Sequence, residues 1–259
     1  MAPPAVERNN ILVTRRMAHA RKWPQKARTE LVQLLRFCWR PTRRHPADVS
    51  MSGITWRMAT ILLAYLVPFT IVLVPVLLGV AKLLGMESAL RLSGTELLIA
   101  SVVFAPLLEE LVFRAGLRSA TMTLAMQPVL IALLFGKWQV ALVLSGVVAL
   151  VALIDYVRQR RLDDATKFSL RMARGRVFIN RYRTIVWGYA IAFGLVHMGN
   201  FTITTTNGLL ACLAVLIVSS QMFLGLLLSY FRLRYGLLSA MGFHALWNLT
   251  YFLADKVVT

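Results

Sequence analysis

Two adjacent carboxylates and an arginine lie within an apolar stretch near the middle of the chain. Glu109, Glu110 and Arg114 interrupt residues 95–117, a stretch long enough to cross a bilayer. An ionised side chain at the bilayer centre costs roughly 2.5–3.5 kcal/mol on insertion scales. Folding does not require that cost, so these residues predict a functional site. A structural ion pair that joins two helices is the alternative interpretation.

Helical spacing separates the roles of the two glutamates. Glu110 and Arg114 are four residues apart, so their side chains meet on one face of a helix and can form an ion pair. Glu109 points about 100° away and has no partner within its own helix. A carboxylate left without a partner is suited to act as a general base.

Two histidines lie deep in later apolar segments. Phe193 and His197 are one helical turn apart, so the aromatic ring can pack against the imidazole and fix its rotamer. His244 and Asn248 have the same spacing and present an imidazole and an amide on one face. Histidines in two separate spans, together with Glu109, favour a shared active-site cavity inside the membrane over two unrelated core residues.

The composition is that of a membrane protein. The 259 residues are 58% hydrophobic with a mean hydropathy of +0.66, whereas soluble domains are about 45–50% apolar. We predict an all-α fold, a polytopic transmembrane helix bundle with seven spans. The predicted spans are residues 55–84, 94–117, 120–136, 138–157, 184–203, 208–230 and 236–254.

The net charge of +18 is concentrated in two segments. Residues 1–57 hold 12 Lys and Arg against 3 Asp and Glu, and residues 158–183 hold 9 against 2. Both segments flank hydrophobic spans, as the positive-inside rule expects. We therefore predict contact with anionic lipid headgroups rather than with nucleic acid. The same distribution predicts that the N-terminus lies in the cytoplasm. We expect the protein in the cytoplasmic (inner) membrane.

A basic segment precedes the predicted membrane domain. Residues 28–39 have an amphipathic pattern typical of a helix that lies in the membrane interface. We assign residues 1–53 to a cytoplasmic or interfacial segment and residues 54–259 to the transmembrane domain. Cys38 and Cys212 fall in unrelated contexts, so neither a disulfide framework nor a thiolate metal site is expected.

In type, order and spacing, the site residues resemble the signature of the CAAX protease and bacteriocin-processing (CPBP, or Abi) family. Its members include the type II CAAX prenyl endopeptidases. The resemblance covers roughly residues 94–254 and implies that residues 54–259 form an intramembrane endopeptidase domain. Eight spans are described for the prenyl proteases, one more than predicted here. The three motifs are Glu109-Glu110-x-x-x-Arg114, Phe193-x-x-x-His197 and His244-x-x-x-Asn248.

The resemblance also implies a role for each site residue. Glu109 would be the base that activates water, and His197 would assist it or orient the water. His244 and Asn248 would polarise the scissile carbonyl and hold the oxyanion. Glu110 would support the site in its pair with Arg114, and Phe193 would support His197.

The metal requirement is left open by the resemblance. The family has been described both as metalloproteases and as glutamate proteases. Glu109, His197 and His244 could bind Zn²⁺ and leave one position for water. The sequence lacks the H-E-x-x-H spacing of zinc-protease helices, which favours metal-independent chemistry.

The expected substrate is a membrane-associated peptide or protein, prenylated or bacteriocin-like, which approaches from the cytoplasmic face. Two other functions fit some of the same features. A non-catalytic membrane scaffold or bacteriocin-immunity protein would keep the buried polar network for folding. A small transporter could use the same ionisable groups, but the sequence has no repeated halves with matched broken helices.

Overall fold

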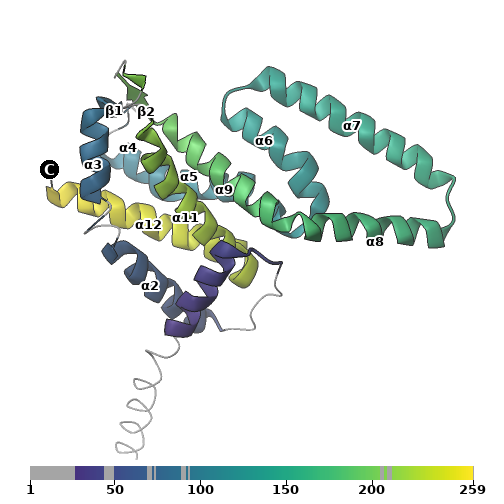
Figure 1. The fold of residues 1–259 in the computed structure, drawn as a ribbon, viewed down its shortest axis with the longest axis horizontal. Coiled ribbons are helices and arrows are strands. Elements are labelled where there is room, and N and C mark those ends of the chain that lie inside the picture. Colours follow the sequence, from purple (N-terminus) through teal and green to yellow (C-terminus); the bar gives the residue numbers. More distant parts are fainter. Residues whose placement is uncertain are drawn as a thin grey trace, which may run out of the picture.

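The computed structural model shows an all-α protein with one short β-pairing (Figure 1). It describes residues 27–43, 50–68, 72, 74–88, 92, 94–204, 207–208 and 212–258. A helix over residues 27–39 comes first. The elements that follow are α2 (Met51–Pro68), α3 (Val74–Leu83), β1 (Met86–Ser88), α4 (Gly94–Ile99), the π-helix η2 (Ala100–Phe104), α5 (Ala105–Phe113), the 3-10 helix η3 (Ala115–Arg118), the π-helix η4 (Met122–Met126), α6 (Gln127–Leu134), α7 (Trp138–Arg160), α8 (Asp164–Asn180), α9 (Tyr182–Met198), β2 (Phe201–Ile203), α11 (Ala214–Tyr235) and α12 (Leu237–Val258).

Helix α11 forms the centre of the main body. Its residues 224–231 are all buried, and α9 and α12 pack along it. Gly194 of α9 permits this close approach, because a Cβ added there would lie 2.7 Å from the carbonyl oxygen of Val218 in α11. The α9–α11 pair therefore forms a tightly packed wall beside the helix that carries the glutamates.

An uneven helical run carries the two glutamates. The π-turns of η2 separate α4 from α5, and the N–H of Ala105 bonds to the carbonyl of Ala100. Pro106 lies in the first turn of α5 and has no N–H to donate, so the regular α-helical ladder is interrupted there. The interruption lies one turn before Glu109, within the predicted span 94–117.

The structure adds detail to two parts of the predicted helix pattern. Within the first predicted span, residues 55–84, α2 ends at Pro68 and α3 begins at Val74. The basic segment at residues 158–183, which separates two predicted spans, contains α8, whose start is capped by a bond from the Thr166 N–H to Asp163 at 2.8 Å.

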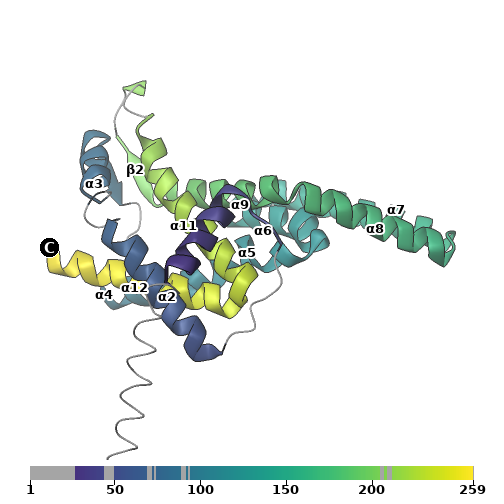
Figure 2. The same cartoon turned by 60° about the horizontal axis from the view of Figure 1, so that its bottom comes forward.

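A short antiparallel sheet was also not predicted. Strand β1 pairs with β2, with Glu87 opposite Thr202. The pairing ties the segment after α3 to the segment after α9. It therefore closes the end of the main body at which α9 ends (Figure 2).

Two helices in the described part of the chain are long and apolar enough to cross a membrane, α7 and α11. Only 6% of the apolar window of α7 is buried by protein, against 50% for α11. In both views α7 and α8 project from the main body, which leaves α7 open to its surroundings (Figures 1 and 2). The predicted number of seven spans stays a prediction.

The helix over residues 27–39 packs on the main body. Its Leu34 and Phe37 belong to the hydrophobic core, and the Phe37 ring lies 5.6 Å from that of Tyr230 in α11. Much of the predicted basic segment, residues 1–26 and 44–49, lies outside the described residues, as do residues 69–71 and 73 of the first predicted span. The domain boundary after residue 53 stays a prediction.

Candidate active site

Helix α5 brings a fully buried ion pair into the main body. Arg114 Nη1 lies 2.9 Å from Glu110 Oε1, and the two side chains are 1% and 0% exposed. This is the i,i+4 pair that the spacing predicts. The pair brings two opposite charges together in the core, where an unpaired charge is costly, and Glu110 Oε2 and Arg114 Nη2 have no hydrogen-bond partner in the described part of the chain.

His244 of α12 is held by the same carboxylate. Its Nδ1 lies 3.0 Å from Glu110 Oε1, and its side chain is 1% exposed. An ionised carboxylate only accepts hydrogen bonds, so Nδ1 carries the proton and donates it. In the neutral imidazole, Nε2 is then left with a free lone pair.

His197 of α9 has the same tautomer for a different reason. Its Nδ1 lies 2.8 Å from the carbonyl oxygen of Phe193, which can only accept, so Nδ1 must donate. The Phe193 ring packs against the imidazole with centroids 4.5 Å apart, as the spacing predicts. The same ring lies 4.0 Å from the guanidinium carbon of Arg114, so Phe193 joins the ion pair to the histidine.

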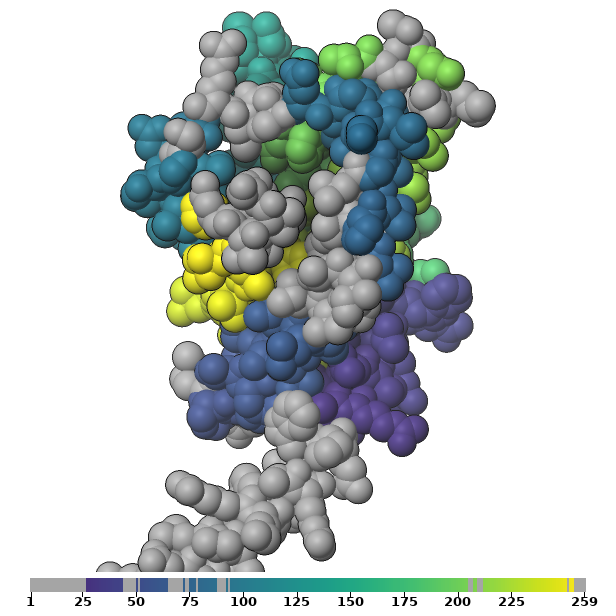
Figure 3. Space-filling model, turned by 90° about the vertical axis from the view of Figure 1, so that its left-hand side faces the viewer, coloured from purple at the N-terminus to yellow at the C-terminus, as the bar shows by residue number. Residues whose placement is uncertain are grey.

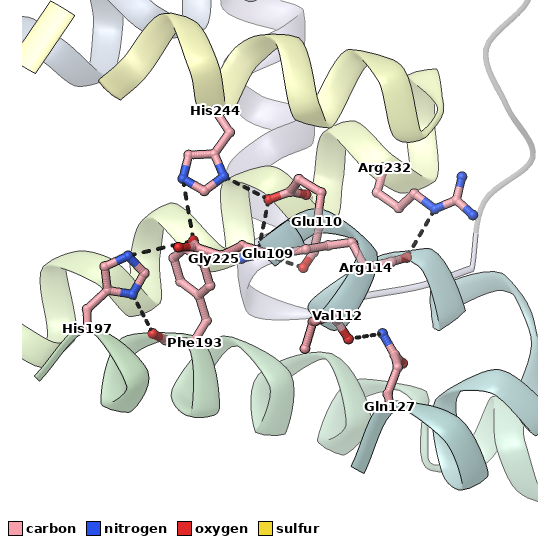
Figure 4. Close-up of polar contacts among 11 residues, drawn as sticks. Glu109, Glu110, Val112, Arg114, Gln127, Phe193, His197, Gly225, Arg232 and His244 are labelled. Atoms are coloured by element: carbon pink, nitrogen blue, oxygen red, sulfur yellow. Dashed lines mark hydrogen bonds and ion pairs between the residues drawn. The ribbon is translucent and has the colours of Figure 1, made fainter. Parts of the chain in front are cut away.

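Glu109 lies between the two imidazoles (Figure 4). Its Oε2 is 3.7 Å from Nε2 of His197 and 3.7 Å from Nε2 of His244. These distances exceed that of a hydrogen bond, and Glu109 Oε2 is buried without a hydrogen-bond partner. A carboxylate oxygen therefore lies 3.7 Å from each of two imidazole nitrogens, and no described group donates a hydrogen bond to that oxygen.

The site is buried but not sealed. The side chains of Glu109 and His197 are 15% and 17% exposed, whereas Glu110 is fully enclosed. On the face shown in Figure 3, green atoms of the α9 region lie recessed between teal atoms of the α4 region and yellow α12. Glu109 and His197 therefore keep a partial exposure at the place where they converge with His244.

Asn248 makes a contact that the sequence did not predict. It follows His244 by one turn of α12, but its Nδ2 donates to the carbonyl oxygen of Ser101 in η2, at 2.7 Å. The amide therefore connects α12 to the irregular turns before α5. One of the two hydrogens on that nitrogen is used by this bond.

The convergence of Glu109, His197 and His244 bears on the zinc interpretation. Carboxylate oxygen and neutral imidazole nitrogen are donors that zinc prefers. Ligands 2.0–2.1 Å from a tetrahedral zinc ion are about 3.3 Å apart, and the separations here are 3.7 Å. No group of three or more His, Cys, Asp and Glu side chains in the described ranges is arranged to hold a metal ion. The donors suit zinc in chemical type, and their separations are somewhat wider than those around a tetrahedral zinc ion.

A second buried carboxylate lies outside the predicted site. Glu30, 3% exposed, accepts from Arg57 Nη1 at 2.8 Å and from the Tyr230 hydroxyl at 2.6 Å. The hydroxyl of Tyr235 also donates to it. The sequence could have indicated that Glu30 is buried, because Glu30 falls on the apolar face of its helix with Leu34.

Sequence reasoning also missed the polar residues that hold the end of α5. Gln127 Nε2 donates to the carbonyl oxygen of Val112 at 3.0 Å, and Arg232 Nε donates to that of Arg114 at 3.1 Å. Figure 4 shows both contacts on the side of α5 away from the histidines. No motif predicts them, because their partners are backbone atoms of a distant segment.

A surface hollow of about 590 Å³ lies on the N-terminal helix. None of the residues that carry the candidate chemistry lines it, so we do not assign it to the site. Its lining residues are Leu35, Arg36, Trp39, Arg40 and Thr42.

Comparison with known proteins gives one match. A family model described as type II CAAX prenyl endopeptidase Rce1-like matches residues 92–250. These residues include every motif residue named above, from Glu109 to Asn248. No curated protein and no solved structure matches the chain.

Proposed function

Because the chain belongs to the Rce1-like family of type II CAAX prenyl endopeptidases, which are membrane-embedded proteases, we propose that it hydrolyses a peptide bond with a water molecule activated by Glu109. The observation that supports this proposal is the convergence of Glu109 Oε2 with the Nε2 atoms of His197 and His244. A group that donates hydrogen bonds in several directions suits that arrangement, and water is such a group.

Each acceptor has a defined task in this mechanism. The water donates one hydrogen to Glu109 and the other to an imidazole Nε2. As its oxygen attacks the scissile carbonyl carbon, Glu109 takes the proton and later delivers it to the leaving amine. Glu110 and Arg114 hold the His244 tautomer, and Phe193 holds that of His197, so the acceptors are oriented before substrate binds.

The oxyanion requires donors. The Nε2 atom of His244 is an acceptor in the tautomer that Glu110 selects, so it stabilises the oxyanion only after it has received a proton. Asn248 has a second N–H besides the one bonded to Ser101, and we assign that hydrogen to the carbonyl oxygen. A single oxyanion donor contributes about 10²–10³-fold to kcat in other acyl-transfer enzymes.

Zinc remains an alternative for the same donors. Glu109, His197 and His244 would hold the ion, which would supply a Lewis acid and a bound water of lowered pKa. In that case Glu110 and Phe193 keep their tasks, since a metal-bound imidazole is oriented by the hydrogen bond at its other nitrogen.

The membrane arrangement is also a proposal. We propose that the chain crosses a bacterial-type inner membrane seven times, with its N-terminus on the cytoplasmic side. The basic residues of α8 then lie at the cytoplasmic surface against anionic lipid headgroups. Arg171 and Arg176 are exposed there, next to the exposed apolar side chains of Phe168 and Met172. The substrate, a membrane-associated peptide that is prenylated or bacteriocin-like, approaches the site from this side.

The test uses full-length protein in nanodiscs and a quenched-fluorescence peptide library, prenylated and unprenylated. Wild type, Glu109→Ala, His244→Ala and the control Glu96→Gln, an exposed glutamate in α4, are compared with and without a strong zinc chelator. Cleavage that survives the chelator and is lost only in the two site variants supports the proposal.

Two other outcomes contradict parts of it. Chelator-sensitive cleavage that zinc restores would place Glu109 and the histidines around a metal ion. Folded wild type that cleaves nothing in either library would favour the non-catalytic scaffold.

A further inference from the structure

The carbonyl groups at the end of α5 are held by side chains from other helices. The last carbonyls of a helix have no partner within it and must find one elsewhere. The acceptors run from Val112 to Leu117, directly after the glutamates. The bonds are Gln127 Nε2 to Val112 at 3.0 Å, Arg232 Nε to Arg114 at 3.1 Å, Arg232 Nη2 to Ala115 at 2.9 Å, Thr123 Oγ1 to Gly116 at 2.5 Å and the Tyr182 hydroxyl to Leu117 at 2.8 Å.

Arg232 differs from the other donors in this set. It comes from the buried core helix α11, and its planar guanidinium bonds two successive carbonyls at once. It also places a positive charge at the negative end of the α5 dipole. Arg118 ties the segment in the opposite direction, since its Nη2 donates to the carbonyl of Leu233 at 2.5 Å. The end of α5 is thus fixed to α11 from both sides.

The residue that Arg232 holds is itself part of the site. Arg114, whose carbonyl oxygen accepts from Arg232, pairs through its side chain with Glu110, and Glu110 holds the His244 tautomer. A shift of the Arg114 backbone therefore moves the carboxylate to which the His244 proton is bonded. Small displacements matter here, because a misplacement of about 1 Å can cost about 100-fold in rate.

We propose that Arg232 is a positioning residue, which sets the placement of Glu109 and Glu110 by fixing the end of α5 to α11. The inference makes two claims: Arg232 affects kcat, which rests on the proposed function, and Arg232 determines which ring nitrogen of His244 carries the proton, which does not. A residue that only stabilised the fold would change the melting temperature without changing kcat or the His244 tautomer.

The test compares Arg232→Lys with Arg234→Lys in nanodiscs. Lysine keeps the charge but cannot form the two-pronged contact. Arg234, two residues further along α11, points to a different side and serves as the matched control. We expect Arg232→Lys to lower kcat about 10- to 100-fold with KM within about twofold of wild type, and Arg234→Lys to leave both unchanged.

A second readout needs no substrate. Nitrogen-15 spectra of the histidine side chains, of which the chain has four, report which ring nitrogen carries the proton, and His244→Gln identifies the relevant signal. We expect Arg232→Lys to abolish the Nδ1–H signature of His244 in a protein that still melts cooperatively. An unchanged His244 signal, or an unchanged kcat in a folded Arg232→Lys variant, would overturn the inference. Wild type that cleaves no peptide contradicts the proposed function, and the His244 signal then decides the role of Arg232 alone.

Discussion

Two clusters in this protein are each built around a largely buried glutamate, and they differ in how completely the carboxylate oxygens are hydrogen-bonded. Around Glu30, an arginine and two tyrosines donate to both carboxylate oxygens. Around Glu109, the neighbours are imidazole nitrogens that accept, and Glu109 Oε2 has no hydrogen-bond partner. Burying a polar group without a partner costs free energy. We therefore interpret the cluster at Glu30 as a stabilising contact. At Glu109 one carboxylate oxygen lacks a hydrogen-bond donor, which a water molecule or a substrate can supply.

The comparison also separates the two adjacent glutamates. Glu110 resembles Glu30 in being enclosed, paired with an arginine and bonded to a second donor, although both bonds go to Oε1 and its Oε2 has no hydrogen-bond partner in the described part of the chain. Glu109 is one residue away, is 15% exposed and lies between the two imidazoles. In the proposed mechanism, adjacent positions on one helix thus divide structural support from chemistry, because successive side chains point about 100° apart.

The largest expected difference between the two clusters is in kcat, after the buried carboxylates Glu110 and Glu30 are each replaced by a neutral glutamine. Glu110→Gln and Glu30→Gln each leave a buried or half-buried arginine without its anion, so each is expected to lower the unfolding free energy by about 3 kcal/mol. Only Glu110→Gln should also lower kcat, by about 100-fold, because His244 loses its acceptor. Thermal melting and steady-state cleavage, measured on the same nanodisc samples, check both. Equal losses of activity in the two variants would remove the distinction between the clusters.

A smaller effect is expected from the aromatic ring that joins Arg114 to His197. Phe193→Leu removes a desolvated cation–π contact worth about 2 kcal/mol and frees the imidazole rotamer. We expect kcat to fall about tenfold. Phe37→Leu, which alters the aromatic contact with Tyr230 at the Glu30 cluster, is the matched control and should change the melting temperature only. A normal kcat in Phe193→Leu would show that His197 needs no such support.

The smallest effect should follow the loss of one hydroxyl. Tyr230→Phe removes a single hydrogen bond to Glu30, which is also held by Arg57 and Tyr235. We expect a loss of about 1 kcal/mol in unfolding free energy, measured by denaturant titration, with unchanged kcat. A change in kcat without a change in stability would link this cluster to the chemistry after all.

The contacts that were predictable from the sequence lie within single helices. The spacing of Glu110 and Arg114, and that of Phe193 and His197, fixes those pairs once a helix forms. The meeting of α5, α9 and α12 was inferred from ionisable residues in separate apolar spans and from a family resemblance, and the structure brings their side chains together. Periodicity alone gives no distance between helices that are far apart in the chain.

The unpredicted contacts depend on how distant helices are aligned. Glu30 and Tyr230 are 200 positions apart, and Arg232 reaches backbone atoms that no side-chain pattern marks. The bond from Asn248 to Ser101 depends on the π-turns of η2, which shift the register of the helix before Glu109. Such contacts follow from packing, which local sequence spacing does not encode.

The most direct test of the central claim is kcat for Glu109→Gln on a peptide that wild type cleaves. Glutamine keeps the shape of the side chain but cannot accept a proton, and Glu96→Gln controls for loss of a charge. We predict a loss of about 10³-fold in kcat, with KM and melting temperature close to those of wild type. A Glu109→Gln protein that is folded and retains kcat within about threefold of wild type would contradict the assignment of Glu109 as the base.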